Sequence, residues 1–277
     1  MQVARLDLMR KLLLLIVVGL FLVSDLEAAD IRPARSLSGA PLPGITIEGS
    51  IAPGDYQKLV EVTLSNTGAQ TVWLASPGGN LSEALRMGRL IRSLGFAVWV
   101  PFSKAEPLVT LKNPANNTCS SSCFLLYAAG VSRRGSVLGV HRPSLPADEY
   151  FSLGLDGAVA AHRVIDQAVN RYLEEMGVPS KYASVMLSTN ANEMVWLSPE
   201  DIHNDLDGVI PEYAERFRNA CPRRALPENT EPYQPQQAVR PGERPAEKAD
   251  VDCISQRLKE MQEERRQSVV ARLLQEK

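Results

Sequence analysis

The chain has 277 residues, which is long enough for one or two domains with a substantial core. Its 30 basic residues against 32 acidic ones give a net charge of −2, which argues against a nucleic-acid partner held by a broadly basic surface. A hydrophobic content of 44% with 22% charged residues is typical of a globular protein and argues against a disordered chain.

The first 29 residues have the pattern of a signal peptide. Basic residues precede the apolar run LLLLIVVGLFLV at residues 12–23, and Ala28 and Ala29 supply small side chains for cleavage. The run has 12 residues, fewer than the ~20 that a membrane-spanning helix needs. We therefore expect export with removal of residues 1–29. The alternative is an uncleaved segment that associates with the membrane through residues 12–23.

Strand and helix patterns then alternate. Residues 30–44 are rich in proline and glycine and predict an extended leader that is not helical. Predicted strands cover residues 45–51, 71–76, 97–102 and 136–143. Predicted helices cover residues 56–66 (capped by Asp55), 81–94, 121–129, 157–176 and a short segment from Ser180. This alternation predicts an α/β fold of βαβ units with a mainly parallel sheet in a domain over residues 30–218.

The composition changes after this domain. Residues 219–250 are rich in proline and poor in large apolar side chains, which predicts a linker. Residues 251–277 favour a C-terminal helix, along which an apolar stripe is interrupted at Arg265. Two interpretations remain open for this helix: it is a solvated helix of marginal stability, or it docks on the domain or on a partner.

Cysteine usage fits an exported protein. The chain has four cysteines, Cys119, Cys123, Cys221 and Cys253. An even number in an oxidising compartment predicts disulfides, and no histidine lies close enough in sequence to a cysteine pair to suggest a metal. Residues four apart on a helix have Cα atoms roughly 6 Å apart, which permits a Cys119–Cys123 bridge and leaves Cys221 to pair with Cys253. The alternative for the first pair is two buried free thiols.

Two further motifs lie at the ends of predicted strands. The sequence SPGGN at residues 76–80 joins a strand to a helix, and Gly78 and Gly79 can adopt left-handed conformations that expose backbone N–H groups. The sequence CSSSC opens a second helix, and His141 follows a later strand, where it could remove a proton from a serine. Each motif alone is a weak signal.

Together, SPGG, the serine turn before FLLYAAG, and the strand VHRP resemble the proteolytic subunit of the Clp protease, in the crotonase-like superfamily. The resemblance covers residues 45–211. It implies that Ser121 is the nucleophile, that His141 is the general base, and that the amides of Gly79 and Ser122 form an oxyanion hole. The exported leader and the Cys-x-Ser-x-Cys turn resemble periplasmic Clp-protease-like proteins of bacteria, which implies a periplasmic location.

The sequence departs from this family at the acid that should orient the histidine. Met194 occupies the position of the family's aspartate, and a shift of one residue would let Glu193 take that role. The stretch between Gly130 and His141 is also shorter than in the family, so stacked rings are not inferred, although a homo-oligomer is compatible with the resemblance. We expect the two remaining histidines, His162 and His203, to lie on helix surfaces without a catalytic role.

The leading hypothesis is therefore an exported serine hydrolase that acts on a peptide or protein substrate without a metal or cofactor. A non-catalytic binding or scaffold protein on the same fold is the alternative, favoured by the missing aspartate. Acyl-CoA chemistry of the wider superfamily is a third hypothesis, and export argues against it because coenzyme A is an intracellular cofactor.

Overall fold

The structure, a computed structural model, describes residues 28–145, 147–221 and 245–275. Its main sheet has the strand order β1-β2-β3-β4-β6-β9. These strands are β1 (Asp30–Arg35), β2 (Pro41–Glu48), β3 (Thr71–Ala75), β4 (Ala97–Trp99), β6 (Ser132–Arg134) and β9 (Gly208–Val209). The central run β2-β3-β4-β6 is parallel, and the two edge strands are antiparallel to it. This confirms the predicted α/β fold with a mainly parallel sheet.

A second, smaller sheet lies beside the first. It has the order β5-β7-β8, with β5 (Cys119–Ser120), β7 (Leu138–Val140) and β8 (Val195–Trp196). β5 and β7 are parallel, and a bridge between Ser76 and Cys119 connects the two sheets. These strands are too short to show a periodic pattern, so the sequence predicted only the strand at 136–143, of which three residues are paired as β7.

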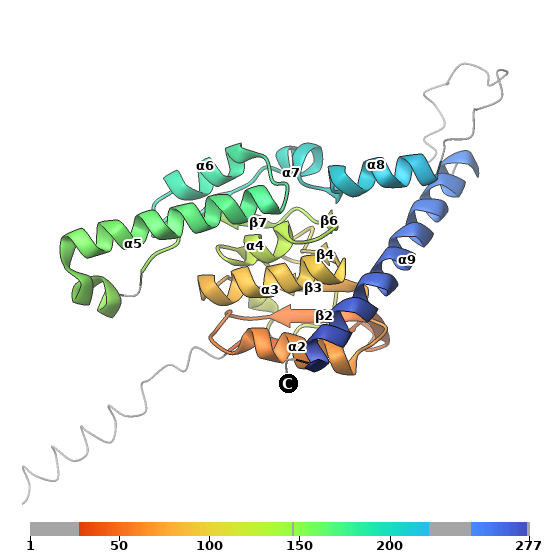
Figure 1. The fold of residues 1–277 in the computed structure, drawn as a ribbon, viewed down its shortest axis with the longest axis horizontal. Coiled ribbons are helices and arrows are strands. Elements are labelled where there is room, and N and C mark those ends of the chain that lie inside the picture. Colours follow the sequence, from red (N-terminus) through yellow and green to blue (C-terminus); the bar gives the residue numbers. More distant parts are fainter. Residues whose placement is uncertain (1–27, 146, 222–244, 276–277) are drawn as a thin grey trace, which may run out of the picture.

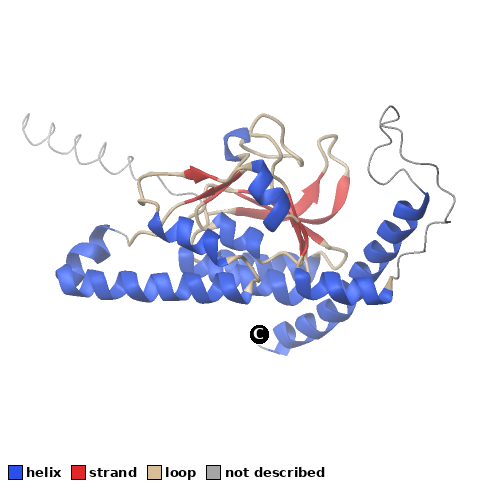
Figure 2. Ribbon diagram, turned by 90° about the horizontal axis from the view of Figure 1, so that it is seen from above, coloured by secondary structure: helices blue, strands red, loops and turns tan. Residues whose placement is uncertain are grey.

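The helices cover the sheets mostly from one side (Figures 1 and 2). They are α2 (Asp55–Ser65), α3 (Leu81–Leu94), α4 (Cys123–Ala128), α5 (Ala147–Glu175), α6 (Ser180–Ser188), α7 (Pro199–Asp205), α8 (Pro211–Ala220) and α9 (Pro245–Gln275), and a 3₁₀ turn spans Pro114–Asn116. Helix α5 begins ten residues earlier than predicted and has a break at Gly154, where φ is 65° and ψ is 179°. The long helix therefore extends well beyond its predicted start at residue 157.

Two predictions at the N-terminal side need correction. Residues 30–44 are extended and not helical, as predicted, but they are part of the domain and not a separate leader, because β1 and the start of β2 pair as an antiparallel hairpin. Asp55 does not cap α2, since Gly54 is the N-cap residue. The buried carboxylate of Asp55 instead accepts hydrogen bonds from the N–H groups of Ala52 (2.7 Å) and Ala29 (3.1 Å). The aspartate thus fixes the turn that leads into the helix.

Helix α3 shows how local sequence sets the packing. The Asn80 side chain accepts a hydrogen bond from the Glu83 N–H at 2.9 Å, and Gly95 ends the helix with φ 69°. Gly88 lets Tyr172 of α5 approach closely, since a Cβ there would lie 1.8 Å from the Tyr172 hydroxyl oxygen. That hydroxyl donates to the carbonyl oxygen of Leu125 in α4 at 2.8 Å. Helices α3, α4 and α5 are therefore locked together.

The C-terminal helix docks on the domain. Met261, Val269 and Leu273 of α9 are buried, and the Gln262 amide donates to the carbonyl oxygens of Gln70 (3.0 Å) and Gly95 (2.8 Å). These carbonyls lie just before β3 and β4, so α9 covers the amino ends of the strands. Of the two interpretations left open, docking on the domain is the correct one for this helix.

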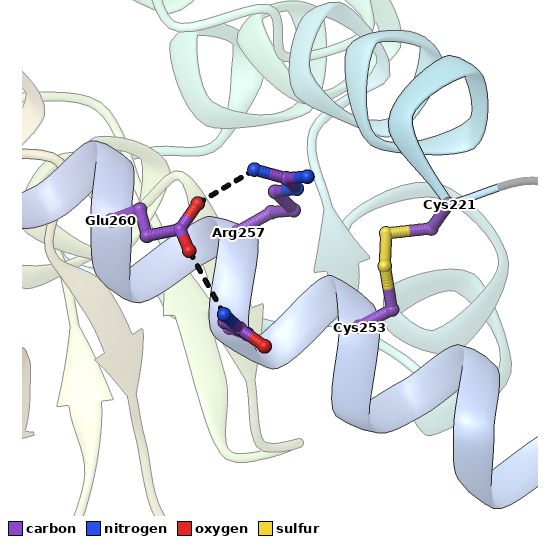
Figure 3. Close-up of a disulfide and its surroundings, with 5 residues drawn as sticks. Cys221, Cys253, Arg257 and Glu260 are labelled. Atoms are coloured by element: carbon purple, nitrogen blue, oxygen red, sulfur yellow. Dashed lines mark hydrogen bonds and ion pairs between the residues drawn. A yellow bond between two sulfur atoms is a disulfide. The ribbon is translucent and has the colours of Figure 1, made fainter.

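A disulfide between Cys221 and Cys253 joins the end of α8 to α9, with Cα atoms 6.0 Å apart (Figure 3). The predicted linker at 219–250 overlaps helices at both ends, because α8 runs to Ala220 and α9 begins at Pro245. Residues 222–244 lie outside the described part of the chain. The C-terminal helix thus begins six residues before its predicted start at residue 251.

The predicted signal peptide lies outside the described residues except for its last two. Ala28 pairs with Ser50, and Ala29 is buried. Within the described ranges, no helix combines the length and apolar character that crossing a membrane requires.

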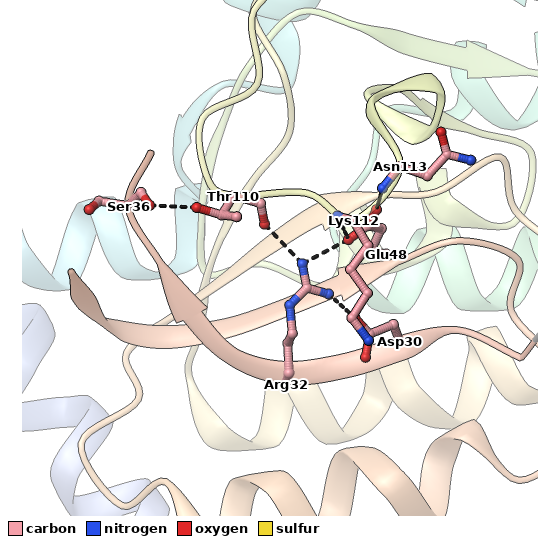
Figure 4. Close-up of polar contacts among 7 residues, drawn as sticks. All are labelled: Asp30, Arg32, Ser36, Glu48, Thr110, Lys112 and Asn113. Atoms are coloured by element: carbon pink, nitrogen blue, oxygen red, sulfur yellow. Dashed lines mark hydrogen bonds and ion pairs between the residues drawn. The ribbon is translucent and has the colours of Figure 1, made fainter. Parts of the chain in front are cut away.

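A polar cluster fastens the loop at residues 103–118 to the hairpin (Figure 4). The buried Glu48 carboxylate accepts hydrogen bonds from the N–H groups of Lys112 (2.9 Å) and Asn113 (2.7 Å) and from the Arg32 guanidinium (2.7 Å). Burial raises the pKa of Glu48, but these hydrogen bonds together bring that pKa below its ordinary value. The cluster matters for the site because this loop ends at Thr118, whose carbonyl oxygen accepts the Ser76 N–H at 2.7 Å.

Candidate active site

The residues predicted to act together surround one pocket at the carboxyl ends of the strands. The pocket has a volume of about 550 Å³, and Gly79, Ser121, Ser122 and His141 are among its lining residues. Gly79 follows β3, Ser121 follows β5, and His141 follows β7. The carboxyl edge of a parallel sheet is where α/β proteins commonly bind ligands. The structure therefore brings four of the five predicted site residues to one cavity.

The glycine turn is held against the segment at Ile51. The Ile51 N–H donates to the Gly78 carbonyl oxygen, and the Asn80 N–H donates to the Ile51 carbonyl oxygen, both at 2.8 Å. The Ser76 hydroxyl accepts the Gly78 N–H at 3.1 Å. Among the described residues, the Gly79 N–H has no hydrogen-bond acceptor. This amide is the one that the resemblance assigns to an oxyanion hole.

Both positions require glycine, because a Cβ would collide with neighbouring atoms and because both φ angles are positive. Gly78 has φ 98° and Gly79 has φ 137°. A Cβ on Gly78 would lie 2.6 Å from the Ser121 Cβ, and a Cβ on Gly79 would lie 2.2 Å from the Ile51 carbonyl oxygen. The glycine turn and the serine turn are thus in direct contact, and no larger residue fits between them.

Ser121 has an unusual backbone conformation. Its φ is 56°, and in the described part of the chain it is the only residue other than glycine with a positive φ. Its N–H donates to the Gly139 carbonyl oxygen at 2.9 Å, which fixes the turn against β7. Left-handed conformations of non-glycine residues are uncommon and cluster at functional sites. The Ser121 backbone is therefore an outlier at the predicted nucleophile.

The neighbouring serines tie the two turns together. The Ser122 hydroxyl donates to the Gly79 carbonyl oxygen at 3.0 Å, and the Ser120 hydroxyl donates to the Pro77 carbonyl oxygen at 3.2 Å. Within the described ranges, the Ser122 N–H has no acceptor. Two unpaired amides, from Gly79 and Ser122, thus belong to turns that are hydrogen-bonded to each other beside Ser121.

The predicted Cys119–Cys123 disulfide is present and brackets the serine turn. The two Cα atoms are 5.3 Å apart, and both side chains are fully buried. At the other end of α4, the buried Arg133 donates to the Ala128 carbonyl oxygen at 2.6 Å. Burial lowers the pKa of Arg133 to about 10. Both ends of α4 are therefore anchored, which limits movement of the turn before it.

His141 is half-buried and makes one hydrogen bond. Its Nδ1 lies 2.9 Å from the carbonyl oxygen of Arg142. Among the described residues, neither its Nε2 nor the Ser121 Oγ has a hydrogen-bond partner, so the two side chains share the pocket without a direct hydrogen bond. Arg142 itself pairs with Asp166 of α5, with 2.6 Å between Nη2 and Oδ2. Neither Arg142 nor Asp166 was singled out from the sequence.

Glu193, the predicted orienting acid, lies elsewhere. It is exposed, it is not among the residues that line the pocket, and its carboxylate makes no hydrogen bond within the described part of the chain. Met194 packs over β7, where its sulfur would lie 2.8 Å from a Cβ on Gly139. The structure therefore leaves a methionine at the position where the resemblance expects an aspartate.

The other two histidines differ from each other. The side chain of His203 is 81% exposed, as predicted for a helix surface. The same prediction is wrong for His162, which is half-buried and whose Nδ1 is buried without a partner among the described residues. His162 is four residues from Ala158 and three from Ile165 on the inward stripe of α5. In the described ranges, no group of three His, Cys, Asp or Glu side chains could hold a metal ion.

Comparisons with known proteins give weak structural similarities. No protein-family model matches the chain, and no curated protein is similar to it in sequence. A serine-to-alanine mutant of the 1510-N membrane-bound stomatin-specific protease is similar with a TM-score of 0.40 and 12% identity, over 64% of this chain and 82% of the other. An enoyl-CoA hydratase from Polaromonas sp. JS666 has a TM-score of 0.32 and 12% identity, over 70% and 76%. At these scores, function must be argued from the site itself.

Proposed function

We propose that the protein is a serine hydrolase that cleaves peptide bonds at the pocket of Ser121. The observation that supports this most is the left-handed Ser121 beside two unpaired amides and a histidine on one cavity. A serine hydroxyl needs a base to become a nucleophile, and His141 is the only base in the pocket lining. No cofactor is required for this chemistry.

In the proposed reaction, the Ser121 Oγ attacks the carbonyl carbon of the scissile bond while His141 Nε2 takes the hydroxyl proton. The N–H groups of Gly79 and Ser122 donate to the oxyanion of the tetrahedral intermediate. His141 then gives the proton to the leaving amine, and water hydrolyses the ester. A preorganised donor of this kind contributes about 2.7–4 kcal/mol to transition-state stabilisation.

The walls of the pocket favour a neutral, apolar substrate side chain. Its lining includes Ile51, Leu81, Pro143, Leu145 and Ile165. Apart from His141, no titratable side chain is among the lining residues. A charged substrate side chain would lose its hydration here without gaining a partner. We therefore expect cleavage after residues with apolar side chains.

We also propose that the protein works in the periplasm. Two disulfides support an oxidising compartment, because such bonds are rare in the bacterial cytosol. The signal-peptide pattern supports the same location, and anchoring through residues 12–23 is the alternative. Alkylation of periplasmic extract without reductant tests this: we expect all four cysteines to be protected, and four free thiols would contradict it.

A second candidate function is binding without turnover. It is favoured by the absence of a hydrogen bond between Ser121 and His141 in the described residues and by Met194 at the acid position. Apo geometry is not decisive, since catalytic hydrogen bonds often form only when the substrate is bound. The two candidates differ in whether Ser121 reacts.

A fluorophosphonate probe on the oxidised protein separates them. We expect the probe to label the wild-type chain at Ser121 and to leave the Ser121→Ala variant unlabelled. Ser120→Ala is the matched control, because Ser120 lies next to the nucleophile and only ties the turn to Pro77; this variant should still be labelled. No labelling of the wild-type protein, or equal labelling of Ser121→Ala, would contradict the hydrolase.

A further inference from the structure

The group that orients His141 is missing from the position where an acid is expected. A serine–histidine pair needs a third group that holds the imidazole ring and fixes which nitrogen carries the proton. Met194 cannot do this, and the exposed Glu193 is not part of the pocket. The question rests on the proposed function, but the orientation of His141 can be measured without any turnover.

The His141 ring has one hydrogen-bond partner in the described part of the chain, and that partner determines the tautomer. Nδ1 lies 2.9 Å from the Arg142 carbonyl oxygen. A carbonyl oxygen has no proton to give, so the hydrogen bond requires a proton on Nδ1. In neutral His141 the lone pair then lies on Nε2, the nitrogen that a general base uses in a serine hydrolase.

Arg142 is held through its backbone N–H and through its side chain. The Arg142 N–H donates to the carbonyl oxygen of the buried Thr189 at 3.1 Å, and the Arg142 guanidinium pairs with Asp166 at 2.6 Å. The ion pair has a single contact, because Arg142 Nε and Asp166 Oδ1 are buried without a partner in the described ranges. Asp166 follows Ile165, which lines the pocket. Helix α5 thus supports the residue whose carbonyl holds the histidine.

We propose that the Arg142 carbonyl oxygen takes the place of the missing acid, and that Arg142 and Asp166 are positioning residues for His141. The carbonyl fixes the ring and its tautomer, as the aspartate of a serine triad does. Being neutral, it stabilises the imidazolium less than a carboxylate would. The chain therefore keeps the orienting function of the third group and loses much of its electrostatic function.

Nitrogen-15 spectra of the histidine side chains test the tautomer directly. In the wild-type protein, with the ring neutral, we expect His141 to carry its proton on Nδ1. The exposed His203, whose Nδ1 lies 4.0 Å from Asp207 Oδ2, gives the spectrum of a histidine outside the pocket for comparison. In Asp166→Asn, we expect the Nδ1–H fraction of His141 to fall and the rate of Ser121 phosphonylation to drop between about ten- and a hundredfold.

Two further variants make the test specific. Glu175→Gln removes an ion pair with Arg89 from the same helix, away from the pocket, and should change neither the tautomer nor the rate. Arg142→Gln keeps the carbonyl and removes the guanidinium; it should reproduce Asp166→Asn and serves if that variant does not fold. A wild-type His141 protonated on Nε2, or a tautomer and rate that neither variant changes, overturns the proposal. An Nδ1-protonated His141 in a protein that the probe never labels supports the orientation and contradicts the hydrolase.

Discussion

The two ends of the strands in the two neighbouring sheets satisfy their polar groups in opposite ways. At the carboxyl ends, the N–H groups of Gly79 and Ser122 have no partner in the described residues, and Ser121 is held in a left-handed conformation. At the amino ends, the Gln262 amide caps the carbonyl oxygens of Gln70 and Gly95. Gly79 is exposed, so its N–H is open to solvent or a ligand, whereas Ser122 is buried and its N–H, without an acceptor among the described residues, is an exception to the rule that buried polar groups are paired. The difference agrees with the proposal that the carboxyl ends hold the functional site, whereas the contacts at the amino ends support the fold.

The two disulfides also differ in this way: one lies at the pocket and the other supports the fold. Cys119–Cys123 closes a separation of 4 residues around the serine turn, whereas Cys221–Cys253 closes a separation of 32 between α8 and α9. In the chain-entropy account, the short loop contributes roughly 2 kcal/mol to stability and the long loop roughly 4 kcal/mol. The short bridge mainly constrains local geometry, and the long one mainly constrains the unfolded chain.

The largest effect is expected from Gly79→Ala. The added Cβ would lie 2.2 Å from the Ile51 carbonyl oxygen, which forces the glycine turn to shift and misplaces an oxyanion donor. Losing such a donor costs about 10²–10³-fold in rate, and we expect phosphonylation of Ser121 to fall by that amount. Gly54→Ala is the control, because Gly54 also has a positive φ but no atom within 4 Å of an added Cβ. Equal rates in the two variants would contradict the role of Gly79.

The next effect concerns stability at the amino end. Replacing Cys221 and Cys253 by alanine should lower the free energy of unfolding by up to about 4 kcal/mol. Because α9 is remote from the pocket, phosphonylation of Ser121 in the folded variant should remain within about twofold of wild type under conditions where the variant is fully folded. Urea denaturation and probe labelling measure the two quantities separately. A large loss of labelling with little loss of stability would contradict the expectation that this disulfide supports the fold and not the pocket.

The reverse pattern is expected for the short bridge. Replacing Cys119 and Cys123 by alanine should lower the free energy of unfolding by only about 2 kcal/mol from the lost cross-link. Ser121 is then free to leave its left-handed conformation, and we expect phosphonylation to fall at least about tenfold because the nucleophile is misplaced. Unchanged labelling in this double variant would show that Arg133 and the hydrogen bonds of the turn suffice to hold it.

The smallest effect is a pH dependence from Glu48. Its pKa is lower in the folded protein than the ordinary value of 4.5, so the carboxylate contributes stability above that pH and the contribution is lost as the pH falls through the folded pKa. Glu48→Gln should therefore weaken the acid dependence of stability below about pH 4.5. Glu61→Gln, at an exposed position, is the control and should leave the wild-type profile unchanged. Parallel profiles for all three proteins would argue against a buried, ion-paired Glu48.

The sequence was most informative where its patterns are local. The SPGG turn, the helix at 81–94 and the Cys119–Cys123 spacing each depend on neighbouring residues, and each was predicted correctly. The hairpin of β1 and β2 was missed because prolines in residues 30–44 suggested an unpaired segment. Prolines are compatible with edge strands, where the missing N–H leaves no unpaired partner.

The missed parts of the site depend on long-range contacts. Arg142 stands next to His141 in the sequence, but its carbonyl becomes important only through Thr189 and Asp166, which lie 47 and 24 residues further along the chain. His162 was placed on a surface because its inward direction depends on how α5 packs. A backbone carbonyl in the proposed role of the third group leaves no signature in the sequence, because every residue has one.

The central claim is that catalysis takes place at the carboxyl ends of the strands. Its most direct test is the turnover of a mixed peptide library by the oxidised protein, measured by mass spectrometry. We expect the wild-type chain to cleave a subset of peptides after apolar residues, and Ser121→Ala to cleave none of them. A wild-type protein that leaves the library intact, or a Ser121→Ala variant that cleaves the same bonds, would contradict peptide hydrolysis at Ser121.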